Sequence, residues 1–401
     1  MSFTLNDCRF FCLILALILY GLIGSPTPDL LGVKELLIGI LLLLSFSYTA
    51  LFFNIKQGSG CGVLWLAIGR FLFWGCLAIG SIGAVIQSAN INAFIRDLVG
   101  LAFLFLPLFL YAHFVKDEGR VFSHVRLLLI VCMFVGVLFA SRSLYGADPL
   151  YYLANMPSVL MAGIICAGYV IKLLVYAGCM RDVLFAFILA VMSLVVALAL
   201  YETLQRASLV AYVGCIIIIT LCFLYQKPLK VTSLIAVFTG IVLIFFSEYL
   251  ADMDGVILAL MRKTQLVGFN QRFEEWAAVW SKISHNPLNL IFGMGWGASF
   301  SSPAVADIEV RYTHSLLSSM LLKTGLMGVC LCLGYLYLLL IGFIGAFRQN
   351  IILWLAFICP LLIDIFLYAS YKSLDFGLLL LLISLFSYFS GEQSDRDMKC
   401  H

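Results

Sequence analysis

The sequence contains few charged residues. Asp, Glu, Lys and Arg make up 11% of its 401 residues, whereas soluble globular domains carry about 25%. Apolar residues make up 63%, and the mean hydropathy is +1.09. So little charge excludes a soluble enzyme, and a scattered net charge of +3 does not suit a nucleic acid partner. The composition therefore predicts an integral membrane protein.

Motifs for nucleotides and metals are also missing. The sequence has no G-x-x-x-x-G-K loop and no H-E-x-x-H helix. None of its thirteen cysteines has metal-ligand spacing with histidine, and most lie inside apolar runs, where Cys acts as a small apolar residue. We therefore predict no metal, no cofactor and no disulfide framework.

What the chain does contain is a series of long apolar runs. A membrane-spanning helix needs about 20 apolar residues, and the runs predict an all-α polytopic protein with about twelve spans. The expected spans are residues 9–24, 35–54, 62–86, 97–114, 124–140, 155–178, 183–201, 207–225, 230–247, 315–346, 351–369 and 374–390.

The spans divide the chain into three parts. Residues 1–247 form an N-terminal bundle of about nine spans, 248–313 a large loop, and 314–401 a C-terminal bundle of about three spans with a short tail. Lys and Arg are concentrated in the short loops on the side of the N-terminus, which predicts cytoplasmic termini and an outward-facing loop. A loop of that length is usually functional.

The loop contains an amphipathic stretch. Between Gln271 and Ile283, helical spacing places Phe273, Trp276, Trp280 and Ile283 on one face, and Glu275 largely off it. We expect a helix that lies in the membrane interface or packs on the outer ends of the spans. Asn286-Pro287 predicts the end of this helix. The glycines from Gly293 to Gly297 predict a turn that lets the backbone approach a ligand or another helix closely.

Basic residues from separate parts of the chain fall at the outer membrane face: Arg142, Arg206, Arg272, Arg311 and His314. Guanidinium groups bind phosphate oxygens bidentately, so these arginines predict an anion site. Taken singly, each is also consistent with an arginine that reaches toward lipid headgroups.

Three further groups belong to this interpretation. His314 suits proton transfer and, in a helix, would share a face with Arg311. Glu202 has i,i+4 spacing to Arg206 and could orient it. Within the spans, Lys323 and Asp364 suggest function by default or could pair with one another.

The C-terminal half resembles the O-antigen ligase and O-antigen polymerase family of bacterial membrane glycosyltransferases. The resemblance covers about residues 205–345, from Gln205-Arg206-Ala207-Ser208 through Arg272-Phe273 and the glycine turn to Thr313-His314-Ser315. The family pattern more often has Ser-Arg-Gly at the first position and His-Asn at the last.

The resemblance implies a bacterial inner-membrane enzyme that uses neither metal nor nucleotide. Its donor would be an undecaprenyl diphosphate-linked glycan and its acceptor lipid A–core, on the periplasmic side. By resemblance, His314 is the catalytic base, and Arg206, Arg272 and, by position, Arg142 bind the donor diphosphate; Arg311 and Glu202 support them.

Two alternatives stay open. A polymerase, which extends the lipid-linked glycan, shares the donor and the chemistry; the single compact loop and the chain length favour the ligase. A transporter or flippase of an anionic lipid or solute would also use arginines and many spans. The one-sided polar residues and the absence of internal repeat symmetry argue against it.

Overall fold

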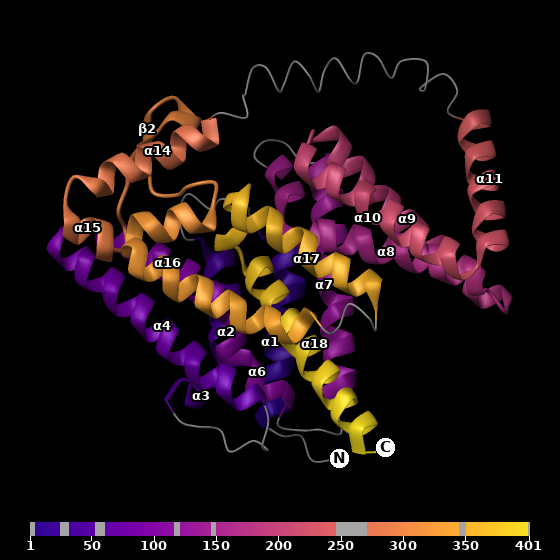
Figure 1. Cartoon of the computed structure of the whole chain (residues 1–401), viewed down its shortest axis with the longest axis horizontal. Coiled ribbons are helices and arrows are strands. Elements are labelled where there is room, and N and C mark those ends of the chain that lie inside the picture. The colour runs from indigo at the N-terminus through magenta and orange to yellow at the C-terminus, as the bar shows by residue number, and fades with distance from the viewer. Residues whose placement is uncertain are drawn as a thin grey trace.

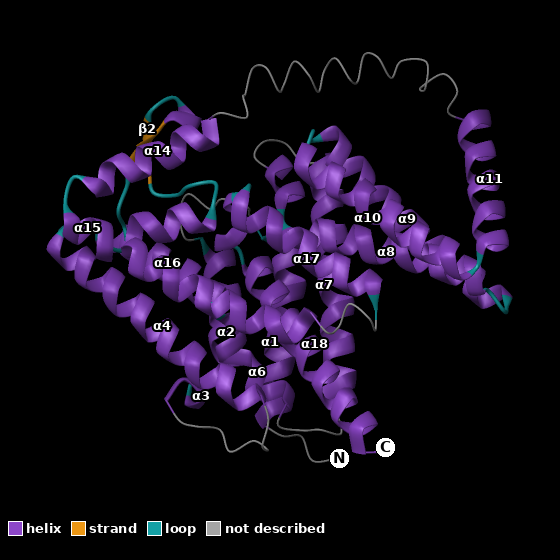
Figure 2. Cartoon of the chain, viewed as in Figure 1, coloured by secondary structure: helices purple, strands orange, loops and turns teal. Residues whose placement is uncertain are grey.

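A computed structural model describes residues 5–24, 32–52, 61–115, 121–145, 150–245, 271–344 and 350–399. Nearly all of them are helical, and Figure 2 shows a single small patch of strand in the described chain. The helices in the first part of the chain are α1 (Leu5–Ile23), α2 (Val33–Ser45), α3 (Thr49–Phe52), α4 (Cys61–Ile86), α5 (Ile91–Leu104), α6 (Leu106–Val115), α7 (Val121–Tyr145), α8 (Pro157–Tyr176), α9 (Met180–Glu202), α10 (Arg206–Gln226) and α11 (Pro228–Phe245).

The later elements begin with the described part of the loop. They are α14 (Gln271–Ser284), α15 (Pro287–Phe292), strands β1 (Phe300–Ser302) and β2 (Ile308–Val310), α16 (Leu316–Phe343), α17 (Ile351–Phe366) and α18 (Leu374–Lys399). Strands β1 and β2 pair as an antiparallel hairpin. Short 3-10 turns lie at Leu150–Asn155 (η1), Pro303–Val305 (η2) and Ala369–Lys372 (η4). The first part of the predicted loop, 248–270, lies outside the described residues.

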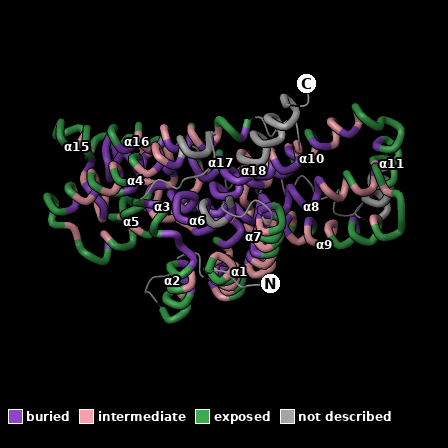
Figure 3. Tube along the Cα trace, turned by 90° about the horizontal axis from the view of Figure 1, so that it is seen from below, coloured by how far each residue is buried: buried purple, intermediate pink, exposed green. Residues whose placement is uncertain are grey.

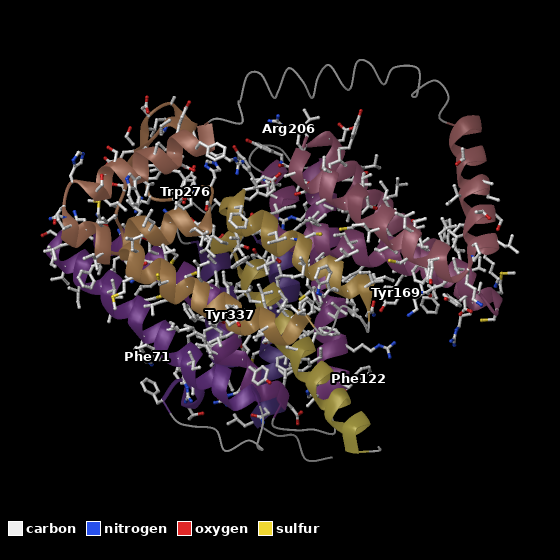
Figure 4. The ribbon with its side chains drawn as sticks, in the orientation of Figure 1. Phe71, Phe122, Tyr169, Arg206, Trp276 and Tyr337 are labelled. Atoms are coloured by element: carbon white, nitrogen blue, oxygen red, sulfur yellow. The ribbon has the colours of Figure 1, made fainter. Side chains whose placement is uncertain are left out.

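The helices confirm the predicted polytopic all-α membrane fold. Seven described helices are long and apolar enough to cross a membrane, and shorter apolar helices accompany them. Large apolar side chains point outward from the bundle, such as Phe71 on α4 and Phe122 on α7, each 71% exposed (Figure 4). In a bilayer these side chains would meet lipid tails.

One predicted span is broken in the middle. The expected span at 97–114 is two helices, because α5 ends at Leu104 and α6 begins at Leu106. Pro107 has no N–H to donate, and its ring would clash with the carbonyl of Phe103 in a continuous helix. The predicted span at 35–54 is likewise divided between α2 and α3.

The core of the bundle surrounds α8. Of the candidate spans, α8 has the largest buried share, 61%, and it packs against α7, α9, α10 and α17. Figure 3 shows buried residues along the middle of the molecule and exposed ones on outlying helices such as α2 and α11. α16 lies along α4 and α18. It also contacts α14 and α15, which belong to the described part of the predicted loop, called the loop segment below.

The two ends of the bundle differ. α1 begins and α18 ends at one end, whereas α14 and β2 lie at the opposite end (Figure 1). The turn η4 lies at this end as well, because Tyr371 Oη donates to the carbonyl of Thr313 at 3.3 Å. The start of α10 lies there too, where Figure 4 shows Arg206. We call this the loop end of the molecule.

The predicted glycine turn holds the loop segment against the bundle. Gly325, inside α16, has φ 64° and ψ −166°, a conformation that side chains rarely adopt. This break frees two helix carbonyls: Leu322 O accepts from Met294 N and Lys323 O from Gly295 N, each at 2.9 Å. The predicted close approach of backbone to another helix is therefore confirmed.

Candidate functional site

A buried carboxylate on α14 contacts His314 at the loop end. Glu275 is 1% exposed. Its carboxylate accepts a hydrogen bond from the backbone N of His314 at 3.0 Å, and both oxygens lie 3.2 Å from the His314 Nδ1. Ser302 Oγ donates to the same carboxylate at 3.1 Å. Helix α14 and the hairpin thereby fix the ring of His314.

This contact gives the two ring nitrogens of His314 different roles. With Nδ1 directed at the carboxylate, Nδ1 carries the proton and Nε2 is left to accept one. The side chain of His314 is 28% exposed, so the ring is accessible. Burial raises the pKa of Glu275, but hydrogen bonds from His314 and Ser302 outweigh it, and the net pKa is below the usual value. Glu275 is therefore an anion that would stabilise the ring of His314 once Nε2 accepts a proton.

The local structure around His314 differs from the prediction. α16 begins at Leu316, with Ser315 as its N-cap in an extended conformation. His314 therefore precedes the helix, and Arg311, exposed just after β2, shares no helical face with it. The His314 ring instead lies against Tyr312, with the two centroids 6.0 Å apart.

The helix predicted at 271–283 is confirmed as α14, and its predicted aromatic face differs from the face that packs on the protein. Phe273 and Trp280 are 73% and 48% exposed, whereas Val279 and Ile283 are fully buried together with Glu275. The packing partners of this face include Phe300, Leu321 and Leu322. Asn286 does not only stop α14: its side chain accepts from Leu288 N and caps α15.

Arg272 of α14 faces Tyr368 and lies within electrostatic range of Arg206. The Arg272 guanidinium lies over the ring of Tyr368, 5.7 Å from its centroid. Its Nη1 is buried without a hydrogen-bond acceptor among the described residues. Burial lowers the pKa of Arg272, and repulsion by Arg206 contributes to the shift. Tyr368 hydrogen-bonds Ser208, two residues beyond Arg206 on α10.

Figure 4 shows Arg206 and Trp276 at the same end of the molecule. Three separate elements, α10, α14 and the connection of α17 to α18, thus bring Arg206, Arg272 and Tyr368 together. Arg272 and Glu275 are three residues apart on α14 and therefore lie on the same side of that helix, so α14 connects the arginines to the His314–Glu275 pair. An unsatisfied buried guanidinium N–H is suited to an anionic ligand.

Two predicted members of the site lie elsewhere. Arg142 donates to the carbonyls of Gly21 and Gly24 at 2.9 and 2.7 Å, so its guanidinium closes the end of α1. Glu202 is exposed at the last residue of α9, and a turn at residues 203–205 separates it from Arg206 at the start of α10. The helical i,i+4 spacing assumed for this pair therefore does not exist.

Lys323 pairs with a different residue than predicted. Its Nζ donates to Asp97 of α5 rather than to Asp364, and the other Asp97 oxygen accepts from Gly297 N at 2.6 Å. Asp364 is 1% exposed and hydrogen-bonds Ser370.

Sequence reasoning missed Glu275, Tyr368 and Asp97. Only Glu275 had a usable signal, because it follows Arg272 by three residues and therefore shares its side of a helix.

These features define a polytopic membrane protein with a histidine–carboxylate pair and an arginine pair at one end of its bundle. Residues 188–333 of the 401-residue chain match the sequence model of the O-antigen ligase family. The match includes Arg206, Arg272, Glu275 and His314. No curated protein matches the chain.

Proposed function

We propose that the protein is an O-antigen ligase that transfers a glycan from undecaprenyl diphosphate to a sugar hydroxyl of lipid A–core. The reaction would take place at the periplasmic face of the inner membrane, with the loop end outside and both termini cytoplasmic. In this proposal 248–313 is the catalytic loop, and the bundles of 1–247 and 314–401 hold the lipid carriers. The transfer would need no metal and would invert the anomeric carbon.

The observation that carries the proposal is the pairing of an oriented imidazole with an unsatisfied arginine. The His314 ring is held by Glu275 through Nδ1 at 3.2 Å, and Arg272 Nη1 is buried without an acceptor among the described residues. A base and an anion receptor that are linked through Glu275, on the same helix as Arg272, suit a reaction in which a hydroxyl is deprotonated and a diphosphate leaves. The family match at 188–333 supports the same chemistry.

The proposed step is a single displacement. The acceptor hydroxyl oxygen attacks C1 of the donor sugar on the side opposite the diphosphate, and its proton passes to Nε2 of His314. The bond between C1 and the diphosphate oxygen breaks, and the diphosphate leaves with the electron pair. Arg272 and Arg206 neutralise the negative charge that develops on it. Glu275 stabilises the imidazolium that forms.

The function is tested with purified protein in detergent. Donor, acceptor and protein are mixed in the presence of a metal chelator, and glycan attached to the acceptor is measured. We expect product with wild-type protein and none with His314→Ala. A transporter would give no product under these conditions, because detergent provides no compartments. The chelator is included because Asp252 and Asp254 are separated by a single residue in the sequence, a spacing that can bind a divalent cation.

Ligase and polymerase are separated in cells. Deletion of the gene is followed by gel analysis of lipopolysaccharide. Loss of all polymeric O-antigen from the core, with polymer accumulating on its lipid carrier, is expected for the ligase. A core capped by a single repeat unit would instead identify the polymerase.

A further inference from the structure

A second group of cations lines a pocket at the loop end. The pocket lies between α5, the outer part of α16 and η4, and its polar lining includes Arg96, Asp97, Lys323, Tyr371 and Lys372. It therefore brings three basic residues and one carboxylate together, beside Ser319 and a largely apolar wall. Arg311 also lies close enough to repel Lys372.

The carboxylate of this pocket, Asp97, already has hydrogen-bond partners within the protein. Asp97 accepts from Lys323 Nζ and from Gly297 N, so both of its oxygens have partners. The Lys372 ammonium lies over the rings of Tyr312 and Tyr371, at 4.9 and 5.7 Å from their centroids. Among the described residues it forms no ion pair. Burial, followed by repulsion from Lys323, lowers the pKa of Lys372 well below its usual value.

The pocket adjoins the candidate base but is distinct from the arginine pair. Tyr312 contacts both Lys372 and His314, with ring centroids 6.0 Å apart in the second contact. The charges that act on Lys372 are Lys323, Asp97, Arg96 and Arg311. The charges that act on Arg272 are Tyr368, Glu275 and Arg206. Because the two groups share no member, two anions can be bound near one imidazole.

We propose that the Lys372 pocket binds a phosphoryl group of the acceptor lipid. This inference rests on the proposed function, in which the arginine pair takes the donor diphosphate and leaves the second cation group for the other substrate. A phosphoryl group would balance the excess positive charge, and lysine binds phosphate as a point charge. Transfer would then require an acceptor that is itself anionic.

The test compares acceptor lipid that retains its phosphates with the same lipid after phosphatase treatment. Each is titrated against purified protein in detergent at fixed ionic strength, and undecaprenyl diphosphate is titrated separately. The variants are Lys372→Met and the charge-retaining Lys372→Arg. Lys172→Met is the matched control, because Lys172 also lies over a tyrosine ring, that of Tyr169 at 5.5 Å, on another helix.

We expect Lys372→Met to weaken binding of the phosphorylated acceptor roughly 10- to 100-fold, the range for a lost charge-assisted hydrogen bond. Lys372→Arg and Lys172→Met should bind it like wild type. Undecaprenyl diphosphate should bind Lys372→Met within about twofold of wild type. Wild type should bind the dephosphorylated acceptor as weakly as Lys372→Met binds the phosphorylated one.

Two results would overturn the inference. Equal affinity of wild type for both forms of the acceptor would show that the protein does not bind a phosphoryl group of the acceptor. This comparison uses wild type only and does not depend on the folding of a variant. Selective loss of undecaprenyl diphosphate binding in Lys372→Met would assign the pocket to the donor. Binding is measured without turnover, so wild type that binds through Lys372 but transfers no glycan would refute the proposed function alone.

Discussion

Replacing Glu275 by Gln removes a buried charge and leaves the shape of the side chain. Glu275 accepts from the backbone N and from Nδ1 of His314, at 3.0 and 3.2 Å, and from Ser302 Oγ at 3.1 Å. A Gln side chain retains one acceptor oxygen and introduces an NH2 group, which cannot accept a hydrogen bond from Nδ1. The imidazole thus loses both the anion and one of its two orienting contacts.

The expected loss follows from the one hydrogen bond that Nδ1 of His314 donates, because the bond from the backbone N does not act on the ring. A hydrogen bond to a charged group contributes about 1.5–3 kcal/mol and a neutral one about 0.5–1.5 kcal/mol. Converting this bond costs about 1–1.5 kcal/mol of stabilisation of the imidazolium that forms during transfer. At about 1.4 kcal/mol for each factor of ten, kcat should fall roughly 5- to 13-fold.

The assay measures initial rates of glycan transfer in detergent at saturating donor. Glu274→Gln is the matched control, because Glu274 is the preceding residue on α14 and is exposed; its rate should equal that of wild type. The KM for donor should change little, since Arg206 and Arg272 are untouched. If Glu275→Gln keeps more than half of the wild-type kcat, Glu275 does not support the base.

Three further predictions concern stability. Gly325→Ala places a Cβ 2.4 Å from Ile291 O at positive φ and should lower the free energy of unfolding by more than about 1 kcal/mol. Gly214→Ala, in open space, should not. Arg142→Met should lower the free energy of unfolding by about 1–3 kcal/mol and leave donor affinity unchanged. Weaker donor binding by this variant would show that Arg142 does bind the donor. Because the pKa of Glu275 is lowered, its contribution to stability is complete above about pH 4.3 and is lost as the pH falls further. Thermal unfolding measures all three, the last as a wild-type advantage over Glu275→Gln that shrinks toward pH 3.

Much of the fold could be predicted from apolar runs alone, because every backbone group in a bilayer must be satisfied within its own helix. The breaks were harder to predict. The break at Pro107 follows from a local rule, the missing N–H of proline. The break at Gly325 does not, since the carbonyls freed there are satisfied by the turn at Met294 and Gly295, about thirty residues earlier in the chain.

Only part of the candidate site could be predicted from the sequence. Arg206, Arg272 and His314 were proposed from residue type, order and family resemblance, and in the structure Arg272 lies against Tyr368 and His314 against Glu275. Glu275 was not proposed because the apolar pattern of 271–283 placed it off the aromatic face, whereas in the folded loop it is buried together with Val279 and Ile283.

Partners across the fold were beyond local reasoning. Lys323 meets Asp97, which lies 226 residues away in sequence, and no periodicity or spacing connects them. Arg142 was placed in the site from its membrane depth alone. Depth does not determine which helix a guanidinium faces, and Arg142 faces the end of α1.

The central claim is that His314 takes the proton of the acceptor while the arginines hold the donor. Single-turnover transfer tests it most directly, with donor affinity and the chemical rate measured on the same His314→Ala preparation. Unchanged donor affinity with a rate at least about 100-fold slower, within the range for a lost general base, is the predicted result. An equal rate at equal donor occupancy would contradict the account.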